Sequence, residues 1–160
     1  MIHGIGQPVR RKEDKRFITG QGQYTADINL PGQLHLAVLR SPVAHGKINR
    51  INTDRAERAE GVVAVITSDE LVAGGVRDMP CKIKSSSRDG TEMPIIEHPV
   101  LAIGRMLYFG EPVAAVIATS KLLAKDAVEL SEFDYEELPA AASASAALAP
   151  GAPQLWPQIR

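Results

Sequence analysis

The side chains that could do acid–base or metal chemistry are scattered along this sequence. None of its four histidines has a second His, a Cys or paired acids at a spacing typical of a metal site; they are His3, His35, His45 and His98. His35 falls in a strand-like segment, which favours a structural role. His45 follows a predicted loop that begins at Ser41-Pro42 and could direct its imidazole toward a neighbour. We predict no metal ligand, no catalytic residue and no cofactor-binding residue in this chain.

Two sets of carboxylates could serve general acid–base catalysis, which needs two acids that converge in a pocket. Three acids alternate along Glu132–Glu136, and this spacing favours a solvent-facing row that discourages edge-to-edge pairing of sheets. Glu111 differs because it lies between Gly110 and Pro112 inside an apolar run, where a carboxylate needs a partner. We predict that Glu111 is a structural anchor that accepts backbone or arginine hydrogen bonds at a domain contact, with a place at the edge of a cofactor as the alternative.

Paired glycines near the N-terminus could belong to a phosphate-binding loop. Gly4-Ile-Gly6 and Gly20-Gln-Gly22 lack the third glycine, the preceding strand, the following helix and the downstream acid of a dinucleotide-binding motif. They predict turns with positive φ instead.

Composition is that of an ordinary globular domain. The 160 residues suit one domain with a real core, and the apolar fraction of 44% and charged fraction of 23% are typical. Aromatic residues make up only 4%, so the core must consist of Val, Ile, Leu and Ala.

Charge and hydropathy exclude several partners. A net charge of −1 predicts neither nucleic acid nor an anionic membrane as a partner. No apolar stretch approaches the roughly 20 residues of a membrane helix, and the first residues lack a secretory pattern, so we predict a cytoplasmic protein. The single cysteine, Cys81, excludes an intramolecular disulfide and is predicted to be an inert surface thiol.

Apolar periodicity and caps predict an α+β fold with a mixed or mainly antiparallel sheet, one main C-terminal helix and short helices. The predicted strands cover residues 34–40, 47–52, 62–66, 105–109, 112–118 and 132–136. The predicted helices cover 54–60, 68–72 and 121–131, with N-terminal caps at Thr53, Thr67 and Ser120. Glu70 completes a capping box with Thr67, and the main helix would bury Leu122, Leu123, Ala127 and Leu130.

Glycine, proline and serine divide the chain. Residues 1–33 are predicted to be an extended arm, and residues 34–139 the folded domain. Within that domain, residues 76–99 have no clean period and form a long loop of the kind that is functional, partner-bound or disordered. Residues 140–160 are rich in Ala, Ser and Pro and are predicted to be a linker.

Several short motifs follow one another in a specific order and spacing. In chain order they are Arg11-Lys-Glu-Asp14, Arg16-Phe-Ile-Thr-Gly20, Gly22-Gln-Tyr24, Leu39-Arg-Ser-Pro42, Ala44-His45, Gly61-Val-Val-Ala-Val65, Gly110-Glu-Pro-Val-Ala114, Asp134-Tyr-Glu136 and Pro150-Gly-Ala-Pro153. Together they resemble the N-terminal domain of molybdenum-hydroxylase large subunits, the xanthine dehydrogenase, aldehyde oxidase and carbon monoxide dehydrogenase family. The carbon monoxide dehydrogenase branch is the most similar.

The resemblance implies an α/β hammerhead that is not catalytic alone and acts as a structural and assembly domain. It also implies that molybdopterin, iron–sulfur clusters and FAD belong to other parts of a complete oxidoreductase, which oxidises or hydroxylates carbon. The implied partners are molybdenum-binding domains of the same or an adjacent chain, with iron–sulfur and flavin subunits. Candidate domain-interface residues are Ser41, Pro42, His45, Gly110, Glu111 and Pro112.

The sequence is also compatible with two other functions. The chain could be a free-standing interaction module that reuses the hammerhead fold and recruits a protein through residues 76–99. It could also be a small hydrolase or isomerase that uses His45 and Glu111.

Overall fold

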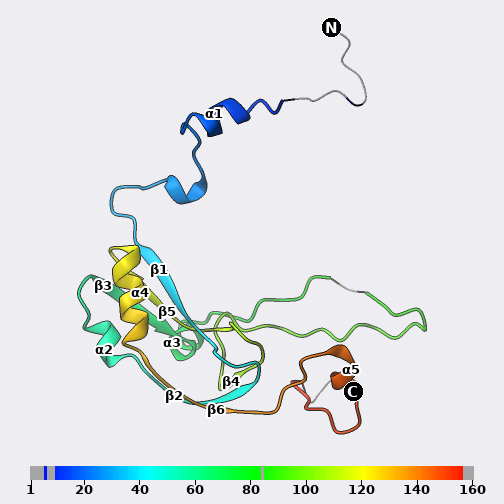
Figure 1. The fold of residues 1–160 in the computed structure, drawn as a ribbon. Helices are drawn as coiled ribbons and strands as arrows, with labels where there is room; N and C mark the ends of the chain where they lie inside the picture. The colour runs from blue at the N-terminus through cyan, green and yellow to red at the C-terminus, as the bar shows by residue number, and fades with distance from the viewer. Residues whose placement is uncertain (1–5, 7–9, 84, 157–160) are drawn as a thin grey trace. The chain divides into compact units, whose positions relative to one another are not determined.

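The structure is a computed structural model that describes residue 6, residues 10–83 and residues 85–156 (Figure 1). Its residues group into two compact units, Met1–Gln33 and Leu34–Arg160, which are described separately.

The N-terminal unit contains a short helix α1 (Asp14–Ile18) and a 3₁₀ turn η1 (Thr25–Asp27). The rings of Phe17 and Tyr24 stack with centroids 5.5 Å apart. Gly22 makes room for this stack, because a Cβ there would lie 2.5 Å from Phe17 Cδ1. Of the glycines predicted to have positive φ, Gly6 and Gly20 do, whereas Gly22 is needed for space; Gly4 lies outside the described residues.

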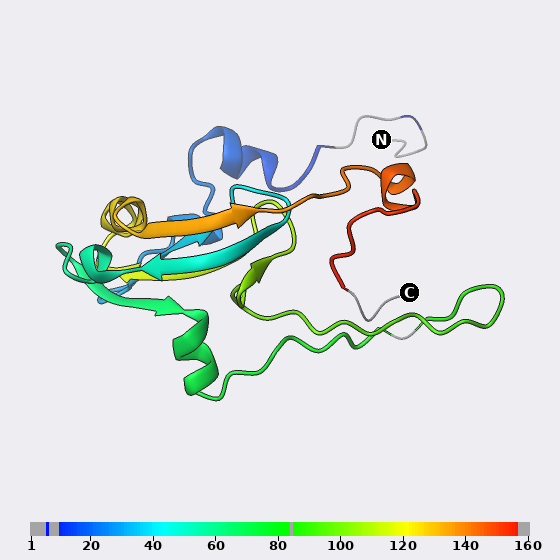
Figure 2. The same cartoon turned by 90° about the horizontal axis from the view of Figure 1, so that it is seen from below.

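Two three-stranded sheets form the second unit (Figures 1 and 2). The first has the order β1-β5-β3, from β1 (His35–Arg40), β5 (Pro112–Ala118) and β3 (Val62–Thr67). The second has the order β4-β2-β6, from β4 (Arg105–Met106), β2 (Gly46–Asn52) and β6 (Glu132–Glu137). Every pairing is antiparallel, which confirms the predicted α+β hammerhead with a mainly antiparallel sheet.

Strand β5 lies between β1 and β3, and its apolar run is buried over Val113–Val116. Val113 belongs to one core with Val43, Ala102 and Met106, and the partly buried Phe133 and Tyr135 pack against that core. Val116 belongs to the other core, with Ala56 and Ala127. Val and Ala make up most of both cores, as the scarcity of aromatic residues predicts, but the first core also contains Met106.

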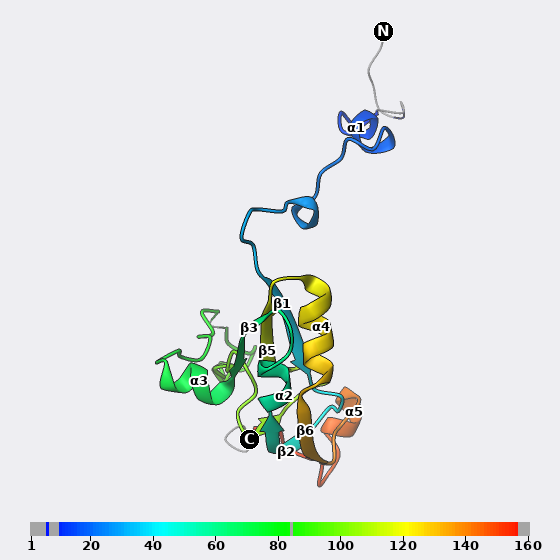
Figure 3. The ribbon, with the colours of Figure 1, turned by 90° about the vertical axis from the view of Figure 1, so that its left-hand side faces the viewer.

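Helix α4 (Lys121–Glu129) lies along β1 and β5 (Figure 3). Its first turn is capped as predicted, since Ser120 Oγ accepts a hydrogen bond from Leu123 N at 3.2 Å. The predicted buried stripe is partly wrong: Leu122 is 68% exposed, and the small Ala124 is fully buried with Ala127. Alanine on that face lets the helix backbone approach the sheet closely, while Leu122 projects from another face.

The two shorter helices differ in how well their caps were predicted. The capping box at α3 (Ser68–Ala73) is confirmed, because the Glu70 carboxylate accepts from both the backbone N–H and the hydroxyl of Thr67. At α2 (Asp54–Glu57) the predicted Thr53 cap is wrong. The backbone of Thr53 is already helical, so its hydroxyl bonds Glu57, and Asn52 Oδ1 accepts from Asp54 N.

Residues 76–83 and 85–99 form two arms that run side by side away from the sheets (Figures 1 and 2). An isolated bridge joins Met79 and His98 at the base, where Met79 N donates to His98 O at 2.7 Å. A second bridge joins Ser86 and Glu92 near the tip.

Residues 140–156 contain a four-residue helix, α5 (Ala144–Ala147), capped by Ser143. In the described part of the chain, no helix is long and apolar enough to cross a membrane.

We predict that Gly61→Ala destabilises the domain by about 1–3 kcal/mol because the new residue would be held at positive φ, and by a further amount because its Cβ would be crowded. Gly61 has φ +73°, and a Cβ there would lie 2.5 Å from Leu123 Cδ1 and 2.7 Å from Thr119 Oγ1. Urea unfolding measures the loss. Gly75→Ala is the control, because Gly75 has φ +74° with nothing within 4 Å. Equal losses in the two variants would show that crowding at Gly61 adds nothing.

The hydrogen bond from the Thr67 side chain lowers the pKa of Glu70. A lowered folded-state pKa means that this interaction stabilises α3 above the ordinary carboxyl pKa and is lost as the pH falls through the lowered value. In Thr67→Val, we expect an NMR titration to show the pKa of Glu70 raised part of the way to its ordinary value. Thr53→Val, which removes a hydroxyl bonded to Glu57, is the control. An unchanged Glu70 titration in Thr67→Val would contradict the assignment.

Candidate functional site

Five of the six predicted interface residues, Ser41, Pro42, Gly110, Glu111 and Pro112, lie where β1 ends and β5 begins, whereas His45 lies at the start of β2. Ser41 N donates to Glu111 O at 2.9 Å, and Gly110 N donates to Ser41 O at 2.9 Å. The Arg40 guanidinium donates to Gly110 O at 2.8 Å. This exchange extends the β1–β5 ladder beyond the register shift between Leu39 and Arg40.

Ser41 turns the chain out of β1. Its side chain is 2% exposed, and its hydroxyl donates to Val43 O at 2.6 Å. Val43 N in turn lies 3.3 Å from Ser41 Oγ. Pro42 has no N–H for a ladder and remains exposed between these two buried residues. The serine hydroxyl therefore replaces the strand pairing that the proline ends.

Glu111 is a buried carboxylate held by backbone. It is 4% exposed, and its Oε2 accepts a hydrogen bond from Leu107 N. Glu111 N also donates to Tyr108 O at 3.2 Å, and Gly110 supplies the positive φ of +84° that this turn needs. The predicted strand over 105–109 therefore ends at Met106, because the Leu107 N–H bonds the carboxylate instead of a neighbouring strand.

His45 ties β2 to the end of β6. Its Nδ1 lies 2.8 Å from Pro139 O, and Leu138 N donates to His45 O at 2.9 Å. A carbonyl oxygen only accepts, so Nδ1 carries the proton. Nε2 is buried without a partner among the described residues, and the side chain is 7% exposed.

His45 and Glu111 are thus both buried and bonded to backbone. A general base must reach the proton of a bound substrate, and these side chains have little access to solvent. Their arrangement supports a structural role better than the hydrolase or isomerase hypothesis.

The exposed residues beside this junction border an apolar hollow of about 400 Å³. Its walls come from Ala44 and residues 107–109 on one side and from residues between 140 and 156 on the other. Tyr108 is 47% exposed and Phe109 is 73% exposed. Exposed aromatic groups at the edge of a hollow are typical of a surface that another protein covers.

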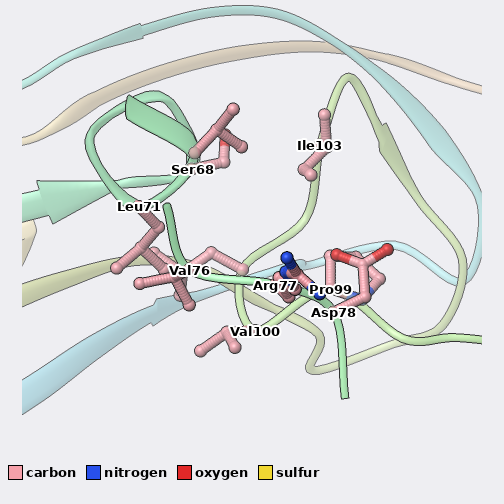
Figure 4. Close-up of a pocket in the computed structure, with 10 residues that line it drawn as sticks. Ser68, Leu71, Val76, Arg77, Asp78, Pro99, Val100 and Ile103 are labelled. Carbon is pink, nitrogen blue, oxygen red and sulfur yellow. The ribbon is translucent and has the colours of Figure 1, made fainter. Parts of the chain in front are cut away.

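A second cavity lies where the long loop leaves α3 (Figure 4). Ser68 and Leu71 from the helix face Val76, Pro99 and Val100 from the stems of the loop. Its volume of about 10 Å³ holds at most one water molecule, so it reflects packing of the loop base against α3.

The acids of β6 lie on an edge strand, since β6 ends the order β4-β2-β6. Glu132 accepts from Asn52 Nδ2 at 3.2 Å, and Glu132, Asp134 and Glu136 are exposed. Among the residues that the structure describes, no three His, Cys, Asp or Glu side chains group closely enough to hold a metal ion.

Comparison with known proteins places this fold in a family. Residues 19–139 match the domain described as "Aldehyde oxidase and xanthine dehydrogenase, a/b hammerhead domain". The chain therefore belongs to the aldehyde oxidase and xanthine dehydrogenase family, as the motifs predict.

Its relatives include large subunits of bacterial oxidoreductases. The chain is 38% identical over 154 residues to the carbon monoxide dehydrogenase large chain of Hydrogenophaga pseudoflava, covering 96% of this chain and 18% of the relative. It is 40% identical over 143 residues to the 6-hydroxypseudooxynicotine dehydrogenase complex subunit gamma of Paenarthrobacter nicotinovorans, covering 84% of this chain and 17% of the relative.

The solved structure of a Cu,Mo-CO dehydrogenase superposes with a TM-score of 0.78 at 35% identity, covering 98% of this chain and 18% of that one. The chain thus spans less than a fifth of the length of these relatives. It corresponds to their hammerhead domain and resembles the carbon monoxide dehydrogenase branch.

We predict that Glu111→Ala destabilises the domain by about 1–3 kcal/mol, because it leaves the Leu107 N–H without its acceptor. Glu111→Gln keeps an acceptor oxygen and should lose clearly less. Urea unfolding compares both variants with Glu129→Ala, which changes an exposed acid on α4. Equal losses in the Ala and Gln variants would contradict a role for the acceptor oxygen.

Proposed function

We propose that this chain acts as the structural and assembly domain of a molybdopterin-dependent hydroxylase or dehydrogenase large subunit. The observation that carries this proposal is the match of almost the whole chain to carbon monoxide dehydrogenase large chains at 35–38% identity. We further propose the domain organisation that the sequence predicts: an arm over residues 1–33, the hammerhead over 34–139, and a connection over 140–160 toward molybdenum-binding domains. The compartment proposed for the enzyme is the cytoplasm.

The cofactors of such an enzyme would be held elsewhere. The residues that the structure describes offer no cluster of three His, Cys, Asp or Glu side chains, so they do not fit an iron–sulfur or metal centre. The buried His45 and Glu111 are directed to backbone groups of this same domain. As the family resemblance implies, we propose that molybdopterin, iron–sulfur clusters and FAD belong to other domains or subunits and that the domain alone is not catalytic.

The proposed contact with those domains is the junction of Ser41, Pro42, His45, Gly110, Glu111 and Pro112. Three of these residues would support the contact without touching a partner, because the side chains of Ser41, His45 and Glu111 are buried. Their hydrogen bonds fix the backbone that presents the neighbouring exposed groups. The surface available to a partner then consists of Pro42, Ala44, Tyr108 and Phe109.

The apolar character of this surface supports the proposal. Phe109 is 73% exposed although it lies just before the buried strand β5, and burying such a ring in a partner is favourable by about 25 cal/mol per Å² of apolar area. Aromatic residues in such positions are frequent anchors of protein interfaces.

We expect a tagged copy of the chain, expressed in its native cells, to recover large partner chains together with molybdenum and iron. Mass spectrometry of the purified complex identifies the chains and measures the metals. Recovery of the chain without metals, or with an unrelated protein, would refute the assembly role and favour the free-standing module that uses residues 76–99.

A Tyr108→Ser/Phe109→Ser double variant makes this experiment specific to the proposed surface. Loss of two anchor side chains should lower recovery of the partner by about tenfold or more. The control is Val63→Ser, which removes an exposed apolar side chain on β3. Equal recovery by the double variant and the control would move the interface to another face.

A further inference from the structure

The segment after β6 is held at two places rather than extended. At its beginning, His45 Nδ1 lies 2.8 Å from Pro139 O, and Leu138 N donates to His45 O. The chain then forms α5, and Gly151 adopts a φ of +77°, which reverses its direction. The Ala152 N–H bonds Ala149 O at 3.1 Å and closes this turn.

The returning residues contact the domain again far from Pro139 in sequence. The Arg105 guanidinium donates to Leu155 O at 3.2 Å. The ring of Trp156 meets the imidazole of His98 edge to face, with centroids 6.0 Å apart and planes at 83°. Edge-to-face contacts of this kind are favourable beyond the area that they bury.

The backbone of both Arg105 and His98 is held in place by hydrogen bonds to other parts of the domain. Arg105 pairs with Lys47 in the β2–β4 ladder. His98 exchanges both backbone hydrogen bonds with Met79 at the base of the long loop. The two side chains therefore form a defined binding position for Leu155 and Trp156. Leu155 lies 50 residues from Arg105 in sequence.

We infer that residues 140–156 form a strap that folds back on the hammerhead and is fastened by Arg105 and His98. The fastened strap forms one wall of the apolar hollow, opposite Tyr108 and Phe109. Opening of the strap would separate the two walls of the hollow and expose the apolar side chains on both. Arg105 and His98 therefore control how much apolar surface the domain presents. One further step rests on the proposed function. In a large subunit, the strap would make the following part of the chain begin beside β4 and the base of the long loop.

The single tryptophan of the chain, Trp156, reports directly on the strap. With excitation selective for tryptophan, we expect collisional quenching by acrylamide to be stronger in Arg105→Ala than in the unchanged chain. Loss of one hydrogen bond raises the ratio of open to fastened strap by about fivefold. Arg105→Lys keeps a donor and should restore part of the protection. His98→Ala should increase quenching in the same direction, because it removes the edge contact.

Arg55→Ala is the matched control, because it removes an exposed arginine from α2 and should leave quenching unchanged. Circular dichroism on each variant verifies that the sheets remain folded. Equal quenching of Trp156 in the unchanged chain, Arg105→Ala and the Arg105→Ala/His98→Ala double variant would overturn the strap. The measurement uses this chain alone, so its failure differs from a failure to recover molybdenum or partner chains.

Discussion

The burial of β5 between β1 and β3 is the constraint on which the rest of the domain depends. Its Val113 side chain enters one core and its Val116 side chain enters the other, so the strand connects two clusters that are otherwise built from different elements. Both edges of β5 are paired, and α4 covers it. A strand buried in this way leaves little freedom for the turn that precedes it.

That turn explains why buried polar groups gather at the junction. Glu111 lies just before β5, and desolvation of its carboxylate is offset by the Leu107 N–H, which would otherwise lack a partner. Ser41 fulfils the same role at the end of β1 through Val43 O. These residues shape the surface from below, while the aromatic residues beside them are left exposed. The proposed interface rests on this division between buried polar side chains and exposed apolar ones.

The residues after Pro139 belong to the region of family likeness and also form the strap. The likeness extends over nearly the whole chain, including residues after Pro139 that have little regular structure. Those residues are nevertheless placed by specific contacts, since Pro139 before them bonds His45, and Leu155 and Trp156 contact Arg105 and His98. A segment of Ala, Ser and Pro can therefore have a defined path when side chains of the hammerhead donate hydrogen bonds to its carbonyl oxygens.

Local sequence determined the elements whose signals are local: the capping box of Thr67 and Glu70, the Ser120 cap and the apolar run of β5. It also showed that Glu111 needs a partner, since a carboxylate in an apolar run is costly. Only the tertiary structure decided which partner this is, why β4 ends at Met106, and that Ala124 rather than Leu122 faces the sheet. It also decided that Trp156 returns to His98. These outcomes depend on which distant backbone groups and surfaces come together, and a periodic pattern along one segment does not contain that information.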